Sequence, residues 1–125
     1  MTVRAFTINN VTYNVAQAPA LQQKKLMLLV GALVAARSST SGQPIDTSLL
    51  MGSLMVLPEA KFDEVAGIVL YKTIIAGEST TLDVGSFQGK ITDYFKLVAE
   101  AIAYNLDDFF TFLASVKPDE ATRDK

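Results

Sequence analysis

The chain has 125 residues, which is the size of one domain and too short for two. It contains no cysteine and no histidine, which excludes disulfides, thiolate nucleophiles, sulfur-bound metals and catalytic schemes that need histidine. The formal net charge of −2 gives no long-range attraction for nucleic acid or anionic lipid. Half of the residues are apolar and only 19% are charged. This balance predicts more apolar surface than one small domain buries, and therefore contacts with other proteins or further copies.

Residues 4–15 have the pattern of a β-hairpin. Apolar and polar residues alternate on both sides of Asn9-Asn10, and asparagine tolerates the positive φ of a tight two-residue turn. Pairing across this turn places apolar side chains on one face, as the pairs Phe6 with Tyr13 and Ile8 with Val11. A hairpin alone is marginal in water, so the helices or a neighbouring subunit must cover this face.

We expect this hairpin to form the contact between subunits, since its apolar face and its exposed edges both favour pairing. The expected subunit-interface residues are Phe6, Ile8, Val11 and Tyr13. An acidic substitution at Phe6 or Tyr13 should then separate the subunits and leave the helices folded.

The longest predicted helix begins at Pro19, whose fixed φ suits a first turn, and ends near Arg37. Its second half, residues 26–36, is apolar all round, which predicts a helix that is enclosed on every side. This segment is far shorter than the ~18–20 residues of a membrane span, and its position is wrong for a signal peptide. We therefore expect a cytoplasmic protein. A polar loop is predicted over residues 38–44.

Two further helices are predicted in the middle of the chain, between residues 46 and 77. One has Asp46 as its N-cap and ends near Val56, and the next begins at Pro58 and ends at Gly77 as a C-terminal cap. The apolar stripe of the later helix consists of Phe62, Val65, Ala66 and Val69, widened by Ile68, Tyr71 and Ile75.

Residues 78–90 are predicted to form a loop, with 80–84 briefly extended. The clearest amphipathic helix begins at about Ser86 or Ile91 and ends at Tyr104. Its apolar face consists of Ile91, Tyr94, Phe95, Val98 and Ile102, and its polar face of Lys90, Asp93, Lys96 and Glu100.

A last short helix is predicted, with Asn105 as its cap and with Asp107 and Asp108 stabilising its N-terminus. Its three phenylalanines cannot all lie on one face; they are Phe109, Phe110 and Phe112. Either this helix is packed on both sides within the fold, or one aromatic side chain faces a partner.

Together these elements predict a mainly α (α+β) fold, a compact bundle of about five helices preceded by an N-terminal β-hairpin. Residues 1–117 should form a single helical domain that includes the hairpin, about residues 4–15. Residues 118–125 form a charged tail that we expect to be disordered.

Few residues are candidates for chemistry. Glu59 and Asp63 lie four positions apart on a predicted helix and could share a proton or a divalent ion, but a solvated acidic face explains them better. The electrostatics of a helix N-terminus explains residues 107–108. The glycines of 85–89 lack the Lys-Ser/Thr of a phosphate-binding loop. No catalytic, cofactor-binding or metal-ligating residue is therefore predicted, and we expect a protein-binding module and not an enzyme.

Three stretches resemble a known family in their order and spacing. They are FTINNVTYNVAQAPALQQ (6–23), LPEAKFDEVAGIVLYKTIIAG (57–77) and SFQGKITDYFKLVAEAIAYNLDDFF (86–110). The pattern is similar to the tail assembly chaperones of long non-contractile-tailed bacteriophages, the lambda-like siphophages, and of their prophage relatives. The resemblance covers residues 6–113 and rests on overall pattern, not on an active-site motif.

The resemblance implies a chaperone that works in the host cytoplasm during tail morphogenesis and is absent from the mature virion. Such chaperones coat the tape measure protein, keep it soluble and help to recruit tail tube subunits. Members commonly self-associate, and many are also made in a frameshifted longer form whose added domain contacts the tail tube protein. No cofactor, nucleic acid or membrane partner is implied. A structural virion component, such as a head–tail joining protein, is the alternative.

A chaperone for a helical client needs apolar stripes that accept amphipathic helices. Methionine suits such a surface because it is unbranched and polarisable. The expected client-contact residues are Met51, Met55, Phe109 and Phe112. Packing within the core is the alternative role for each of them.

Overall fold

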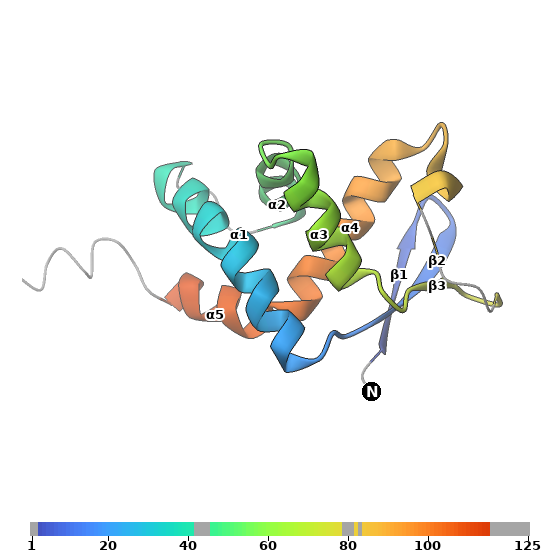
Figure 1. Ribbon diagram of the computed structural model, residues 1–125, viewed down its shortest axis with the longest axis horizontal. Coiled ribbons are helices and arrows are strands. Elements are labelled where there is room, and N and C mark those ends of the chain that lie inside the picture. Colours follow the sequence, from blue (N-terminus) through green and yellow to red (C-terminus); the bar gives the residue numbers. More distant parts are fainter. Residues whose placement is uncertain (1–2, 42–45, 79–81, 83, 116–125) are drawn as a thin grey trace, which may run out of the picture.

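The computed structural model describes residues 3–41, 46–78, 82 and 84–115, without the side chains of 38–41 and 114. Within these ranges it contains five α-helices and a three-stranded antiparallel sheet, with the helices on one side of the molecule and the sheet on the other (Figure 1). The predicted mainly α (α+β) fold with an N-terminal hairpin is confirmed. The predicted charged tail lies outside the described residues.

Strands β1 (Val3–Ile8) and β2 (Val11–Ala16) form the predicted hairpin in the predicted register, with Phe6 opposite Tyr13. The turn residues Asn9 and Asn10 have φ angles of 51° and 69°, in the left-handed region that asparagine tolerates. The local sequence therefore determines this hairpin.

A third strand, β3 (Ile74–Ile75), pairs with β2 and was not predicted. Helix α3 (Glu59–Val69) ends well before Gly77, so the predicted C-terminal cap at Gly77 is wrong. The segment after α3 instead pairs with the free edge of β2. There the N–H of Ala76 donates a hydrogen bond to the carbonyl of Thr12 at 2.9 Å. Gly77, with φ +90°, instead lies in the turn that follows β3.

Helix α1 (Ala20–Ser41) continues through much of the predicted polar loop. Only one side of it faces the core, along a line that includes Leu26, Val30 and Val34. Leu28 is 74% exposed, so the prediction of a helix enclosed on every side is wrong. Among the described residues, no element covers Leu28 on the outer side of this helix. Among the described residues, no helix is long and apolar enough to cross a membrane.

Helix α2 (Thr47–Leu54) begins as predicted at Asp46, whose carboxylate accepts a hydrogen bond from the N–H of Leu49 at 2.9 Å. It ends two residues before the predicted end at Val56. Pro58 is the N-cap of α3, as predicted. The predicted stripe of α3 is buried from Phe62 to Val69, whereas Tyr71 is exposed and Ile75 belongs to β3.

Helix α4 (Ile91–Asn105) is the central element, because α2, α3, β1 and the last helix all pack against it. Its predicted faces are confirmed at Tyr94, Val98, Ile102 and Lys96 and are wrong at two positions. Ile91 is exposed, while Asp93 is buried and its carboxylate accepts a hydrogen bond from the Asn9 side chain at 2.6 Å. Leu97 and Ala101 are fully buried as well, so α4 is enclosed over more than one stripe.

An aromatic cluster joins the sheet to the helices. Its centre is Phe87, at the end of the short 3₁₀ helix η1 (Val84–Phe87). The ring of Phe87 lies 5.9 Å from that of Tyr13 on β2 and 5.3 Å from that of Tyr94 on α4. The hairpin face that needed a cover is therefore covered within the chain.

Helix α5 (Asp107–Ser115) completes the fold. Asn105 does not cap it. The Asn105 side chain instead accepts a hydrogen bond from the buried N–H of Ala18 at 2.8 Å and donates one to the carbonyl of Ala101 at 2.9 Å. Asp107 and Asp108 lie in the first turn of α5, where a carboxylate is favourable.

Candidate protein-binding surface

Helices α1 and α5 meet at a glycine, where an aromatic ring of α5 lies against the backbone of α1. A Cβ atom at Gly31 of α1 would lie 3.2 Å from both the Phe109 ring of α5 and the Met27 side chain. Phe109 therefore packs over the backbone of α1 and is only half-buried. The neighbouring Phe110 is buried in the core.

Exposed apolar side chains flank this contact on both helices. Leu28 precedes Gly31 by three residues and Phe112 follows Phe109 by three, so each shares a helix flank with a contact residue. Phe112 is 60% exposed. We call this surface the α1–α5 patch; it consists of Met27, Leu28, Phe109, Phe112 and Leu113.

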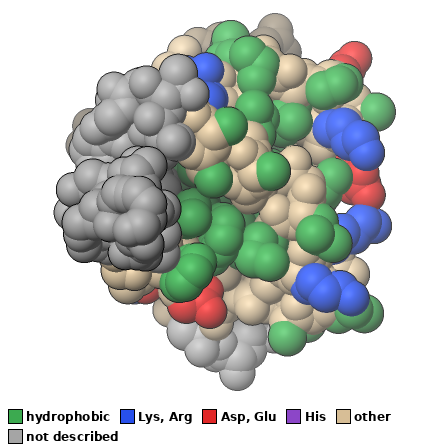
Figure 2. Space-filling model, turned by 90° about the vertical axis from the view of Figure 1, so that its left-hand side faces the viewer, with side chains coloured by type: hydrophobic (Ala, Val, Ile, Leu, Met, Phe, Trp, Pro, Cys, Tyr) green, Lys and Arg blue, Asp and Glu red, His purple; other side chains and the backbone are tan. Residues whose placement is uncertain are grey.

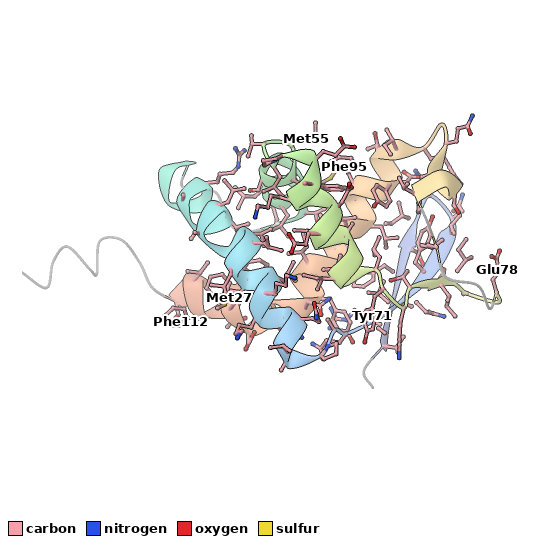
Figure 3. All side chains as sticks on the ribbon, in the orientation of Figure 1. Met27, Met55, Tyr71, Glu78, Phe95 and Phe112 are labelled. Carbon is pink, nitrogen blue, oxygen red and sulfur yellow. The ribbon has the colours of Figure 1, made fainter. Side chains whose placement is uncertain are left out.

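The α1–α5 end of the molecule is shown in Figure 2. Hydrophobic side chains run through the middle of the described part of this face, and basic side chains gather along one edge. Met27 and Phe112 are labelled close to each other on this end in Figure 3. Figure 3 also labels Met55 at a different part of the molecule, away from Met27 and Phe112.

The four expected client-contact residues thus fall into two groups. Phe109 and Phe112 belong to the α1–α5 patch. Met55 is 70% exposed just beyond the end of α2, while Met51 is half-buried and packs against the core. The structure does not bring the methionines and the phenylalanines into one surface. Leu28 was missed, because the apolar run of residues 26–36 does not show which of its residues face outward.

The four expected subunit-interface residues lie mostly inside the chain. Ile8 and Tyr13 are core residues, and Tyr13 is only 2% exposed, so neither side chain is available to a second subunit. Phe6 and Val11 are half-buried, with the Phe6 ring edge-on to Tyr104 at 6.1 Å. The expectation that an acidic residue at Tyr13 leaves the helices folded is therefore corrected, because a carboxylate there would enter the core.

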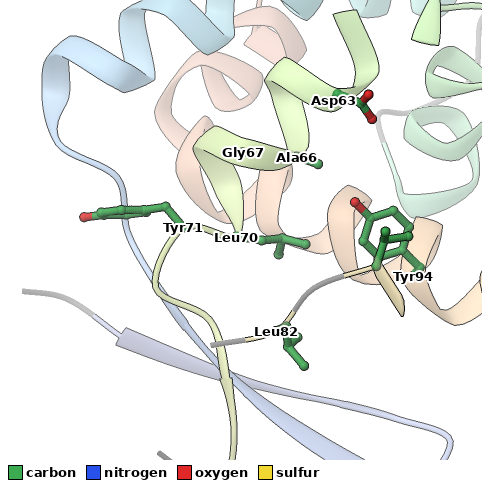
Figure 4. A pocket seen from close by; sticks show the side chains of 8 residues that line it. Asp63, Ala66, Gly67, Leu70, Tyr71, Leu82 and Tyr94 are labelled. Carbon is green, nitrogen blue, oxygen red and sulfur yellow. The ribbon is translucent and has the colours of Figure 1, made fainter. Parts of the chain in front are cut away.

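One shallow depression of about 270 Å³ lies between α3, η1 and α4 (Figure 4). The charged group in its lining is Asp63, which is exposed; the other polar side chains are those of Tyr71 and Tyr94. The lining contains one carboxylate, that of Asp63. Among the described residues there is also no cluster of three or more carboxylates that could hold a metal ion.

Two buried tyrosines predict how stability depends on pH. Burial raises the pKa of Tyr13 above its usual 10.0, and Asp93 adds to this; burial and then Asp63 do the same for Tyr94. The folded state thus holds these protons more tightly, so the free energy of unfolding should fall as pH rises above about 10. Urea titrations of wild type and a Tyr13→Phe/Tyr94→Phe variant, at pH 8 and above, measure this. The variant should lose part of the fall; an identical pH dependence would contradict the assignment.

Comparisons with protein families, with curated proteins and with solved structures give no match to this chain.

Proposed function

We propose that this chain is a protein-binding chaperone that holds helical segments of a phage tape measure protein during tail assembly. In this proposal it keeps the client soluble in the host cytoplasm, helps to recruit tail tube subunits and leaves before the virion matures. It associates with further copies of itself, and a frameshifted longer form contacts the tail tube protein. It acts on no small-molecule substrate and needs no cofactor.

The observation that carries the proposal is the α1–α5 patch. An exposed phenylalanine and an exposed leucine on neighbouring helices are the kind of anchors that accept the apolar stripe of an amphipathic helix. The family resemblance of the sequence supplies the identity of the client. The shallow depression at Asp63, with its single exposed carboxylate, gives no comparable support for an enzyme.

Phe112→Ser tests the patch directly. The chain is co-expressed with the tape measure protein encoded beside it, and soluble client and co-purification are scored. We expect wild type to keep the client soluble and Phe112→Ser to lose at least about tenfold in client affinity, as expected for an aromatic anchor. Because Phe112 is largely exposed, the variant should keep the stability of wild type.

The matched control is Val84→Ser, which also removes a half-exposed apolar side chain but lies on η1, away from both helices. It should bind the client as wild type does. If wild type leaves the client insoluble and unbound, the tape measure role is wrong. If both variants bind equally well, the client binds elsewhere and the α1–α5 patch is not the site.

The alternative is a structural virion component such as a head–tail joining protein. The same exposed apolar residues would then form a permanent contact in the particle. Mass spectrometry of purified mature virions separates the two functions, because a chaperone should be missing from them.

A further inference from the structure

Strand β1 is an edge strand, since the order in the sheet is β1-β2-β3. The register shows which of its backbone groups are unpaired. Ile8 and Val11 flank a two-residue turn and form a hydrogen-bonded pair. Because such pairs alternate along the ladder, Ile8, Phe6 and Arg4 direct their backbone groups toward β2. The carbonyl of Thr12 points the other way, to Ala76 beyond β2. Its partner Thr7 therefore points its own N–H and C=O out of the sheet.

By the same alternation, the outer edge of β1 presents the N–H and C=O groups of Val3, Ala5 and Thr7. Among the described residues none of these groups has a backbone hydrogen-bond partner outside the hairpin. The side chains of all three residues are exposed as well. Within the described residues this edge lacks two common protections, because β1 contains no proline and its one charged residue, Arg4, lies over the Tyr104 ring at 4.9 Å.

We propose that the β1 edge pairs with the β1 edge of a second copy, antiparallel and centred on Ala5. Ala5 then faces Ala5 of the other copy, and Val3 faces Thr7, so that all three outward residues of each strand are paired. The two sheets join into one of six strands. The inference deepens the self-association in the proposed function and does not depend on the tape measure client.

Side-chain chemistry favours this register for a second copy. In the register centred on Ala5, Arg4 of each copy lies opposite Phe6 of the other. A shift by two residues toward the N-terminus would instead set Arg4 directly opposite Arg4, and like charges across a strand pair are destabilising. A shift the other way leaves Val3 without a partner in the strand.

The outer edges of the joined sheet would resist pairing with further copies. Its outermost strand in each copy is β3, which has only two residues. The carbonyl of Thr73, just before β3, already accepts a hydrogen bond from Leu82 at 3.2 Å. Such a short edge resists further pairing, so a dimer is expected and not a fibre.

Single cysteines test the register, because the chain has none of its own. In the proposed pairing the two Ala5 Cα atoms lie about 5.5 Å apart, within the range that a disulfide spans. Ala5→Cys should therefore give a covalent dimer under mild oxidation. Thr7→Cys is the matched control: the two Thr7 positions lie about 14 Å apart, four residues along the strand, and should not cross-link. A mixture of Val3→Cys and Thr7→Cys chains should cross-link again.

Proline gives a second test that needs no cross-link. Ala5→Pro removes an outward N–H and no hydrogen bond of the hairpin, so the fold should persist while the mass by light scattering falls to that of a monomer. Ala5→Val keeps the N–H and should remain dimeric. The proposal is overturned if Ala5→Cys cross-links no better than Thr7→Cys, or if Ala5→Pro keeps the wild-type mass. An oligomer that persists in both cases would leave self-association standing without this edge, and client binding is scored separately.

Discussion

Phe87→Ala is expected to lower the free energy of unfolding by about 3–5 kcal/mol, the usual cost of truncating a buried phenylalanine. Phe87 is 2% exposed and lies between Tyr13 of the sheet and Tyr94 of α4. Its stiff aromatic neighbours cannot easily collapse into the space that the ring leaves. Because a hairpin alone is marginal, the sheet should also lose protection first.

Urea denaturation followed by circular dichroism measures the loss, and amide hydrogen exchange of β1 and β2 locates it. Phe112→Ala is the matched control, since Phe112 is exposed on α5 and its truncation should change stability by no more than about 0.5 kcal/mol. Similar losses for the two variants would show that Phe87 does not hold the sheet on the helices.

Asn105→Ala should lower the free energy of unfolding by about 1–3 kcal/mol, although it removes only a small polar side chain. Asn105 is 3% exposed, and its side-chain oxygen is the partner of the buried Ala18 N–H. Alanine removes the hydrogen bonds that the Asn105 side chain makes to that N–H and to the carbonyl of Ala101, and both groups are buried. The segment between β2 and α1 would lose its attachment to α4.

Gln23→Ala is a suitable control for this substitution. The Gln23 side chain contacts the same Asn105 oxygen, but at 3.5 Å and only partly buried. We expect a change within about 0.5 kcal/mol for Gln23→Ala. A loss as small as this for Asn105→Ala would contradict the role of Asn105 as a bridge between the two segments.

The candidate binding surface was only partly predictable. Phe112 was one of three phenylalanines that a short helix could not bury together, and it is the exposed one. Which of the three would face outward depended on where α1 lies, and that was not visible in the sequence. Leu28 was assigned to an enclosed segment because apolar composition shows only what could be buried. Tyr13 was assigned to an interface because its cover, Phe87, comes from a distant segment.

The sequence by itself determined the elements whose causes are local. The hairpin register follows from two asparagines at the turn, and the starts of α2 and α3 follow from Asp46 and Pro58. Apolar spacing determined the core stripe of α3 in the same way. Each of these features depends on residues within a few positions of one another, so a pattern in the chain is sufficient to predict it.

The tertiary structure alone decided the features whose partners are far apart. The segment after α3 pairs as β3 with the free edge of β2. The Asn105 side chain, which was predicted to cap a helix, instead accepts a hydrogen bond from the Ala18 N–H, 87 positions away. Asp93 likewise became a buried partner of Asn9. A hydrogen-bonding group has several possible partners in a sequence, and only the packed fold selects one by bringing it within reach and excluding water.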